Sequence, residues 1–148
     1  MPLGRQLALT HKALHAWTDA VLAEHGSSLS TWIVLHNASL APSPGLSQRE
    51  LADGMGIGGP ALVRHIDRLE SEGVVVRTRD AADRRITRVT LTPAGRRLHD
   101  ELTARMRQID ADLRAHLTAT EQRVLARALT KIARFADETP ITKEAETA

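Results

Sequence analysis

The chain has 148 residues, 42% of them hydrophobic, which fits one domain with a substantial core. It contains no cysteine, so disulfides, thiolate catalysis and cysteine-based metal or redox sites are excluded. No apolar run approaches the roughly 20 residues that span a bilayer. His11, Lys12 and His15 interrupt the N-terminal segment where a signal peptide would carry its apolar core. We therefore expect a cytoplasmic protein with no membrane partner.

The charge is concentrated in the middle third of the chain. The net charge is only +2, but all basic residues except three lysines are arginine. Ser47 to Arg97 holds ten arginines and seven acidic residues, a net of +3, while the rest carries a net of −1. Arginine forms planar, bidentate pairs with phosphate and guanine that lysine cannot form. This mild asymmetry indicates a nucleic-acid surface in the middle third.

Helical periodicity dominates the first part of the chain. Leu7, Leu14, Trp17 and Val21 share one face of a predicted helix that ends near Gly26. A second predicted helix covers residues 29–40 and stops at the loop APSPG.

Two shorter helices follow this loop. Ser47 and Glu50 have capping-box spacing and predict a helix over SQRELADGM. Pro60 suits the first position of the next predicted helix, PALVRHIDRLESEG, and Gly73 suits its C-cap. The residues of this helix expected to face the core are Leu62, Val63, Ile66 and Leu69.

The pattern changes after Gly73. The segments VVVRTR (74–79) and ITRVTL (86–91) are rich in β-branched residues and flank the turn composition DAAD, which predicts a hairpin. Thr92 and Pro93 cap and open a long helix. Thr118 and Glu121 form a second capping box that opens the last helix. The polar tail after Pro140 is expected to fray.

This order of elements predicts a mainly α fold with a small β-hairpin, namely a winged helix-turn-helix with a helical dimerisation region. A single domain spans residues 1–148: dimerisation helices over 1–40 and 93–138, the winged lobe over 46–92, and a tail over 139–148. The apolar stripes of the first and last two helices exceed what one small lobe can cover, and a twofold homodimer would bury them. The residues expected in this interface are Leu7, Leu14, Leu102, Ile109, Leu113, Leu129 and Ile132.

The stretch RTRDAADRRITR places five arginines around the predicted turn. A hairpin is narrow enough to enter the minor groove, where A·T-rich tracts attract arginine. Asp83 lies two residues from Arg85 and can hold that side chain extended through a charge-assisted pair. The alternative interpretation is a charged turn that is simply solvated. The helix-turn-helix directly upstream favours the DNA-binding wing over this alternative. The arginines expected on phosphates, where they position the protein without reading sequence, are Arg79, Arg84 and Arg88.

Three stretches resemble the multiple antibiotic resistance regulator (MarR) family, closest to its SlyA-like branch. They are LSTWIVLHNA (29–38), LSQRELADGMGIGGPALVRHIDRLESEGVV (46–75) and DAADRRITRVTLTPAG (80–95). The D-x-R of the wing followed by LTPAG is the most specific part, whereas the flanking helices match in layout and length. The resemblance implies a homodimeric winged-helix DNA binder, often a repressor released by small aromatic acids.

The resemblance also implies which residues meet duplex DNA. Arg64 is the expected base reader, because arginine pairs bidentately with guanine in the major groove. Arg85 matches the minor-groove arginine of the family and Asp83 its partner. The start Gly58-Gly-Pro60 departs from the usual Ser/Thr-bearing start of this helix, which leaves base preference open. The full set expected to contact DNA is Ser47, Gly59, Pro60, Ala61, Leu62, Arg64, His65, Arg68, Arg79, Asp83, Arg84, Arg85 and Arg88.

Trp32 and His36 lie one helical turn apart, and two interpretations stand. Trp32 is simply a core residue, or the pair forms the aromatic wall and polar tip of a pocket between the DNA-binding lobe and the dimerisation helices. The family resemblance supports the second interpretation and a small aromatic acid as effector. The residues expected in such a pocket are His11, His15, Trp32 and His36.

Two further motifs predict neither metal nor cofactor. His11 and His15 have metal-ligand spacing, and His36, His99 or His116 could converge on them. Lys12 stands where a zinc protease needs glutamate, however, and zinc requires three or four ligands. GMGIGG (54–59), with Asp80 downstream, has the form of a dinucleotide fingerprint, but that motif must follow a strand and SQRELAD predicts a helix.

Two other classes of function fit less well. An enzyme, such as the dimerisation lobe of a methyltransferase, would need a carboxylate pair or a nucleophile–base set, and none stands out. A winged helix that binds RNA or protein is the other class. Single-stranded RNA is bound by stacking bases on aromatic side chains, and this chain has only three aromatic residues. We expect a homodimer that is not an enzyme and that binds a pseudo-palindromic DNA duplex as a regulator released by a small aromatic ligand. The alternative is a regulator that responds to no ligand or to a metal ion.

Overall fold

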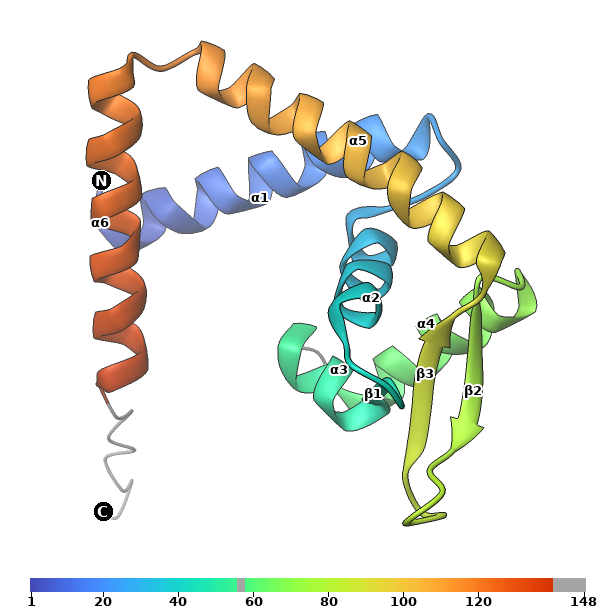
Figure 1. Cartoon of the computed structure of the whole chain (residues 1–148). Coiled ribbons are helices and arrows are strands. Elements are labelled where there is room, and N and C mark those ends of the chain that lie inside the picture. The colour runs from blue at the N-terminus through green and yellow to red at the C-terminus, as the bar shows by residue number, and fades with distance from the viewer. Residues whose placement is uncertain (56–57, 140–148) are drawn as a thin grey trace, which may run out of the picture. The chain divides into compact units, whose positions relative to one another are not determined.

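The computed structural model describes residues 1–55 and 58–139 (Figure 1). The elements are α1 (Leu3–Ala23), α2 (Leu29–Leu40), β1 (Leu46–Ser47), α3 (Gln48–Met55), α4 (Gly59–Ser71), β2 (Val75–Arg79), β3 (Thr87–Leu91), α5 (Pro93–Ala115) and α6 (Ala119–Glu138). The chain divides into two compact units, residues 1–107 and 108–148. The predicted mainly α fold with a small antiparallel sheet is confirmed. The expected frayed tail lies outside the described residues, as do positions 56 and 57 of the glycine-rich turn.

The predicted capping residues set the helix ends. The Ser47 hydroxyl accepts a hydrogen bond from Glu50 N–H at 3.1 Å, and the Glu50 carboxylate accepts from Ser47 N–H at 2.6 Å. Thr118 and Glu121 form the same reciprocal pair at the start of α6. Gly73, at φ +71°, ends α4 in the left-handed conformation that favours glycine. Within the described residues, no helix is long and apolar enough to cross a membrane.

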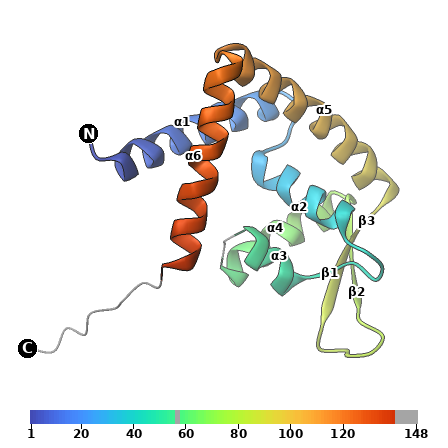
Figure 2. The same cartoon turned by 60° about the vertical axis from the view of Figure 1, so that its left-hand side comes forward.

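The predicted hairpin is present, but it belongs to a larger sheet. Strands β2 and β3 pair antiparallel, from Val75 opposite Leu91 to Arg79 opposite Thr87. Strand β1 adds to the other edge of β3, with Leu46 opposite Val89, so the order is β1-β3-β2. A two-residue strand has no periodicity to read, and the sequence therefore predicted a two-stranded hairpin. In both views the β2–β3 loop extends beyond α3 and α4 (Figures 1 and 2).

The core of the first unit draws side chains from α1 to α5 and from the sheet. Val63, expected to face this core, is 39% exposed. Residues at spacings of four and three, Leu62, Ile66 and Leu69, already fill the inward stripe of α4, which leaves Val63 at its border. The most deeply buried members are Leu22, Val34, Leu35, Leu51, Leu62, Ile66, Leu69, Val75, Val89 and Leu102.

The first turn of α5 packs tightly against the base of the wing. The Thr92 hydroxyl accepts a hydrogen bond from Gly95 N–H at 3.0 Å and donates to the Gly73 carbonyl at 2.7 Å. A methyl group on Gly95 would overlap the carbonyl oxygen of Val74. The glycine of the LTPAG motif is therefore required by close backbone approach.

The second unit contains the end of α5 and helix α6. The Gln122 side-chain amide donates to the carbonyls of Arg114 at 3.0 Å and Leu117 at 3.1 Å, which closes the turn between them. Helix α6 leaves a row of apolar side chains exposed, namely Val124, Leu125, Leu129 and Phe135.

Candidate nucleic-acid interface

Helix α4 presents its N-terminal turn to solvent. It begins at Gly59, with Gly58 as an extended N-cap that has no capping side chain, and Pro60 lies in the first turn. Ala61 and Arg64 are exposed. Leu62, which the sequence analysis placed among the DNA contacts, is 1% exposed and packs in the core, so we withdraw that assignment.

His65 is partly buried, whereas the Arg68 side chain is 49% exposed and also contacts other residues of the lobe. Arg68 Nη2 donates to the Thr31 hydroxyl on α2 at 3.0 Å, and Nη1 lies 3.8 Å from Glu72. Burial lowers the pKa of His65, and the positive charge of Arg68 lowers it further. His65 Nε2 is buried and has no hydrogen-bond partner in the described part of the chain. The DNA contacts expected at His65 and Arg68 stay predictions.

The wing tip holds Arg85 out into solvent. Its side chain is 94% exposed. The Asp83 carboxylate accepts a hydrogen bond from the Arg85 backbone N–H at 2.9 Å, and the same oxygen lies 3.6 Å from Arg85 Nε. Arg79 Nη1 donates to the Arg84 carbonyl at 2.8 Å, which ties the two arms of the loop together. The predicted Asp83–Arg85 pair is thus present, and its role on DNA stays a prediction.

Asp80 shapes the wing loop, a role that the sequence analysis missed. Its buried carboxylate accepts from Ala82 N–H at 2.8 Å, from Asp83 N–H at 3.0 Å and from Arg88 Nε at 2.8 Å. The hydrogen bond from Arg88 and those from the two backbone N–H groups lower the pKa of Asp80. The turn composition DAAD was the available signal, since aspartate often accepts from the backbone two residues on.

Arg88 belongs to the interior of the lobe. Besides Asp80, it contacts the Gly45 carbonyl at 3.2 Å and Glu50 at 3.3 Å, and its side chain is only 20% exposed. These contacts fasten the wing to the start of α3. We therefore give Arg88 an internal role in place of the expected phosphate contact.

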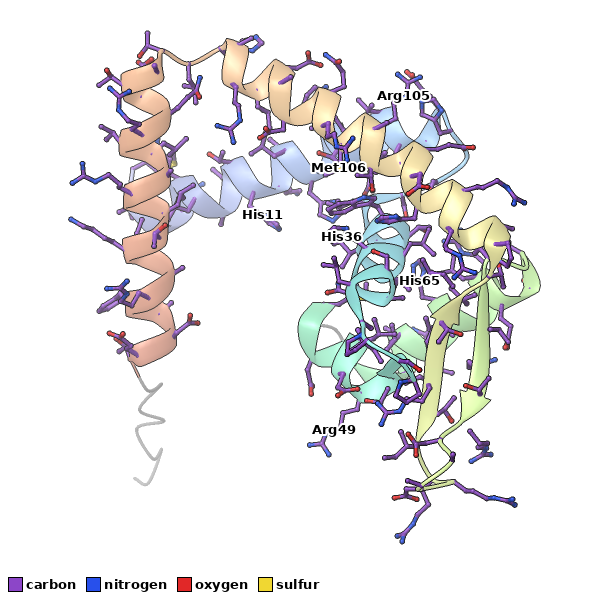
Figure 3. All side chains as sticks on the ribbon, in the orientation of Figure 1. His11, His36, Arg49, His65, Arg105 and Met106 are labelled. Carbon is purple, nitrogen blue, oxygen red and sulfur yellow. The ribbon has the colours of Figure 1, made fainter. Side chains whose placement is uncertain are left out.

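A cleft of about 520 Å³ separates the start of α3 from β3 and the end of the wing loop. Arg49 and Ser47 line it from the α3 side, and Arg85 lines it from the wing side. Arg49, labelled in Figure 3, points away from the lobe and was not singled out in the sequence because it belongs to no motif. Two guanidinium groups beside a helix start suit a phosphate backbone.

The predicted pocket residues form two separate pairs. The Trp32 and His36 rings stack on α2 with centroids 4.7 Å apart. His11 and His15 meet edge to face on α1, and His15 Nδ1 lies 3.1 Å from Asp19. Within the described residues, no hydrogen bond or ring contact joins the two pairs. No three His, Asp or Glu side chains there could hold a metal ion.

Helix α5 completes the Trp32 cluster with two residues that the sequence analysis did not assign to the pocket. Trp32 Nε1 donates to the Thr103 hydroxyl at 3.1 Å, and His36 Nδ1 lies 3.2 Å from His99 Nε2 (Figure 3, which labels His36). Trp32 also packs against the buried core, in agreement with the simpler interpretation.

Two of the predicted interface residues, Leu102 and Ile109, are buried within the single chain. Leu102 is fully buried in the core of the first unit, because the first turns of α5 cover the lobe. Ile109 is also buried, at 4% exposure. Leu7 and Ile132 are partly buried, whereas Leu14, Leu113 and Leu129 are exposed.

A short helix, a turn, a second helix with an exposed start and a basic hairpin with an extended arginine define a winged helix-turn-helix DNA-binding protein. A model of the MarR family matches residues 25–86. The solved structure of transcriptional regulator PA3341 is 33% identical, with 93% of this chain and 100% of that chain covered and a TM-score of 0.78. The chain belongs to the MarR family, whose members regulate transcription and are not enzymes.

Two other solved structures show how closely the fold matches. CouR from Rhodococcus jostii RHA1, solved with p-coumaroyl-CoA, is 28% identical, with 94% of each chain covered and a TM-score of 0.76. MepR from S. aureus, solved as a DNA complex, is 20% identical, with 90% of this chain and 98% of that chain covered and a TM-score of 0.81.

Proposed function

We propose that this MarR-family regulator is a homodimeric, cytoplasmic repressor that binds a pseudo-palindromic duplex. Arg64 reads a base edge in the major groove, and Arg85 enters the minor groove. The observation that carries the proposal is the wing tip, where Arg85 is 94% exposed and Asp83 holds its backbone and lies beside its guanidinium. Asp80 supports the proposal because it accepts from the Ala82 and Asp83 N–H groups and so holds the loop that carries Arg85 in one shape.

Three further arginines near the wing contact phosphates in this proposal. Arg79 and Arg84 flank the wing tip, and Arg49 lies across the cleft at the start of α3. Such contacts fix register without reading sequence, and each releases counterions when it forms. The proposal therefore includes a steep loss of affinity with salt.

Dimerisation is supported by the apolar side chains that single chains leave exposed. Leu14 on α1 and Leu129 on α6 are 38% and 45% exposed, and Phe135 is 69% exposed. A twofold dimer buries such faces and presents two copies of α4, the proposed recognition helix, to one side of the duplex. Half-sites then lie about one helical turn, ~34 Å, apart.

Selection of duplexes from a random pool tests this proposal. We expect inverted repeats whose half-site centres lie about 10 base pairs apart. Binding measured across salt concentrations should show a slope set by several phosphate contacts. Selected single half-sites, or affinity that does not change with salt, would contradict the proposal.

The effector that we propose is a small aromatic acid. The cluster of Trp32, His36, His99 and Thr103 offers an aromatic wall with polar groups where α2 meets α5. CouR was solved with an aromatic acyl-CoA, and its similarity to this chain adds support. A ligand shifts DNA binding only if it prefers the DNA-incompetent state.

Tryptophan fluorescence can test the effector, because the chain has only two tryptophans. In a Trp17→Phe variant, emission comes from Trp32 alone. We expect salicylate at millimolar concentration to quench that emission and to weaken DNA binding over the same concentration range. Full DNA affinity and unchanged emission would remove aromatic acids from the proposal and leave the DNA-binding part intact.

A further inference from the structure

Arg77, in the middle of β2, forms ion pairs with two carboxylates of α4. Its Nε and Nη2 donate to Glu70 Oε2 at 3.0 and 2.6 Å, and its Nη1 lies 2.7 Å from Asp67 Oδ1. The Arg77 backbone N–H donates to the other Glu70 oxygen at 3.1 Å. Asp67 and Glu70 lie one turn apart on α4, so a single wing residue holds two successive turns of the recognition helix.

The guanidinium of Arg77 is committed to this internal contact. Its side chain is 27% exposed, which contrasts with 94% for Arg85 at the wing tip. Hydrogen bonds from the Arg77 side chain, and then from its backbone N–H, lower the pKa of Glu70, so this acceptor is ionised at neutral pH. A planar fork that meets two carboxylates is a geometry that lysine cannot reproduce.

The wing has two fastenings on different helices. Arg88 on β3 joins Asp80 and Glu50 and so ties the wing to α3. Arg77 on β2 ties it to α4. A hairpin held only at its base could swing relative to the helix beside it, whereas a side chain that bridges strand and helix fixes the angle between them.

We propose that Arg77 is a positioning residue for DNA binding: it locks the wing to the recognition helix so that Arg64 and Arg85 keep the spacing that the two grooves require. This inference rests on the proposed entry of Arg85 into the minor groove. Arg77 itself touches no DNA in this proposal, and its effect on affinity passes through Arg85.

Distance measurement between spin labels tests the lock without DNA. The chain has no cysteine, so Ala61→Cys on α4 and Ala81→Cys on the wing accept labels at two exposed positions. Labelled chains are diluted with unlabelled chains so that only distances within one chain are measured. We expect a narrow distance distribution in the parent, a broad or shifted one with Arg77→Met, and an intermediate one with Arg77→Lys.

A control comes from an arginine–carboxylate pair on the surface of α5. Arg114 Nε lies 2.7 Å from Asp110 one turn away on α5, so Arg114→Met removes one arginine–carboxylate pair outside the wing. This variant should leave the label distances unchanged. Circular dichroism of each variant shows that the helices stay folded, and Arg77→Lys serves if Arg77→Met does not fold.

A double-mutant cycle on the selected duplex tests the functional half. Positioning predicts that Arg77→Met weakens binding and that Arg77→Met/Arg85→Ala binds no more weakly than Arg85→Ala alone, because a misplaced arginine has little left to lose. Losses that multiply, or an unchanged distance distribution in Arg77→Met, would overturn the inference. A broadened distribution combined with wild-type affinity for Arg85→Ala would instead overturn the minor-groove proposal and keep the lock between β2 and α4.

Discussion

At the wing tip, the sign of the Asp83 effect separates two physical accounts of DNA binding. If only the charge field matters, loss of an acid near DNA tightens binding. If Asp83 positions Arg85, through contacts of 2.9 Å to its backbone and 3.6 Å to its Nε, its loss weakens binding. We expect Arg85→Ala to cost about 1–3 kcal/mol per half-site and Asp83→Ala to cost part of that.

Asp83→Asn is the informative control for this prediction. The amide keeps an oxygen acceptor for the Arg85 backbone N–H but removes the negative charge, so it should bind DNA better than Asp83→Ala. Arg84→Ala should weaken all duplexes alike and lower the salt slope by about one. Fluorescence anisotropy at several salt concentrations measures these effects, and tighter binding by Asp83→Ala would contradict the positioning account.

Gly95 is a residue whose identity is set by packing. A side chain there meets the Val74 carbonyl, so Gly95→Ala must push α5 away from the base of the wing. We expect destabilisation of about 1–3 kcal/mol. Gly54→Ala is the control: Gly54 lies within α3, where an added methyl group meets open space, so the change should be neutral or stabilising. Urea unfolding measures both variants, and equal stability of Gly95→Ala and the parent would refute the packing argument.

At the scale of elements, the wing is fastened by carboxylates whose pKa values are lowered. Hydrogen bonds from Arg88 lower the pKa of Asp80, and hydrogen bonds from Ser47 lower the pKa of Glu50. Hydrogen bonds from Arg77 lower the pKa of Glu70. A lowered folded-state pKa stabilises the fold above the unfolded value, about 4 for these groups, and this stabilisation is lost as pH falls through the folded value.

We therefore expect the wing to loosen below about pH 4 while it stays ordered at pH 7. Hydrogen exchange of the Ala82 and Asp83 N–H groups, corrected for intrinsic rates, reports the loosening directly because Asp80 accepts from both. The Thr31 N–H, held by the Ser28 hydroxyl, is the non-titrating control. In the Asp80→Asn variant, the Ala82 and Asp83 N–H groups should exchange faster than in the parent already at pH 7. Equal protection of the wing amides at pH 3 and pH 7 would be evidence against this account.

At the scale of the whole molecule, two leucines of the predicted interface should behave differently. Leu129 is 45% exposed, so Leu129→Asp should leave each chain folded and prevent dimerisation. Leu102 is fully buried, so Leu102→Asp places an unpaired carboxylate in the core and should unfold the lobe. Sedimentation gives the mass and circular dichroism the helix content. A folded Leu129→Asp dimer would contradict the proposed interface.

Short-range signals explain how much of this fold the sequence could predict. Caps, turns and hairpin composition act within a few residues, so Ser47 with Glu50, Gly73 and the DAAD turn placed the helix and strand ends closely. The Asp83–Arg85 pair was also predictable, because two residues in one tight turn are close in any fold that keeps the turn.

Tertiary packing decided the rest, since it joins residues that sequence spacing does not relate. An apolar residue in a periodic stripe can face its own lobe or a partner, and burial separated Leu102 from Leu129. An arginine in a wing can face DNA or a neighbouring helix. Only the structure showed that Arg77 and Arg88 are paired within the lobe and are 27% and 20% exposed, whereas Arg85 is 94% exposed. By itself, the sequence determined the family, the order of elements and the location of the basic wing. The structure determined which of its charges are exposed and which are paired inside the lobe, because the partners of a buried charge come from elements that are distant in the sequence.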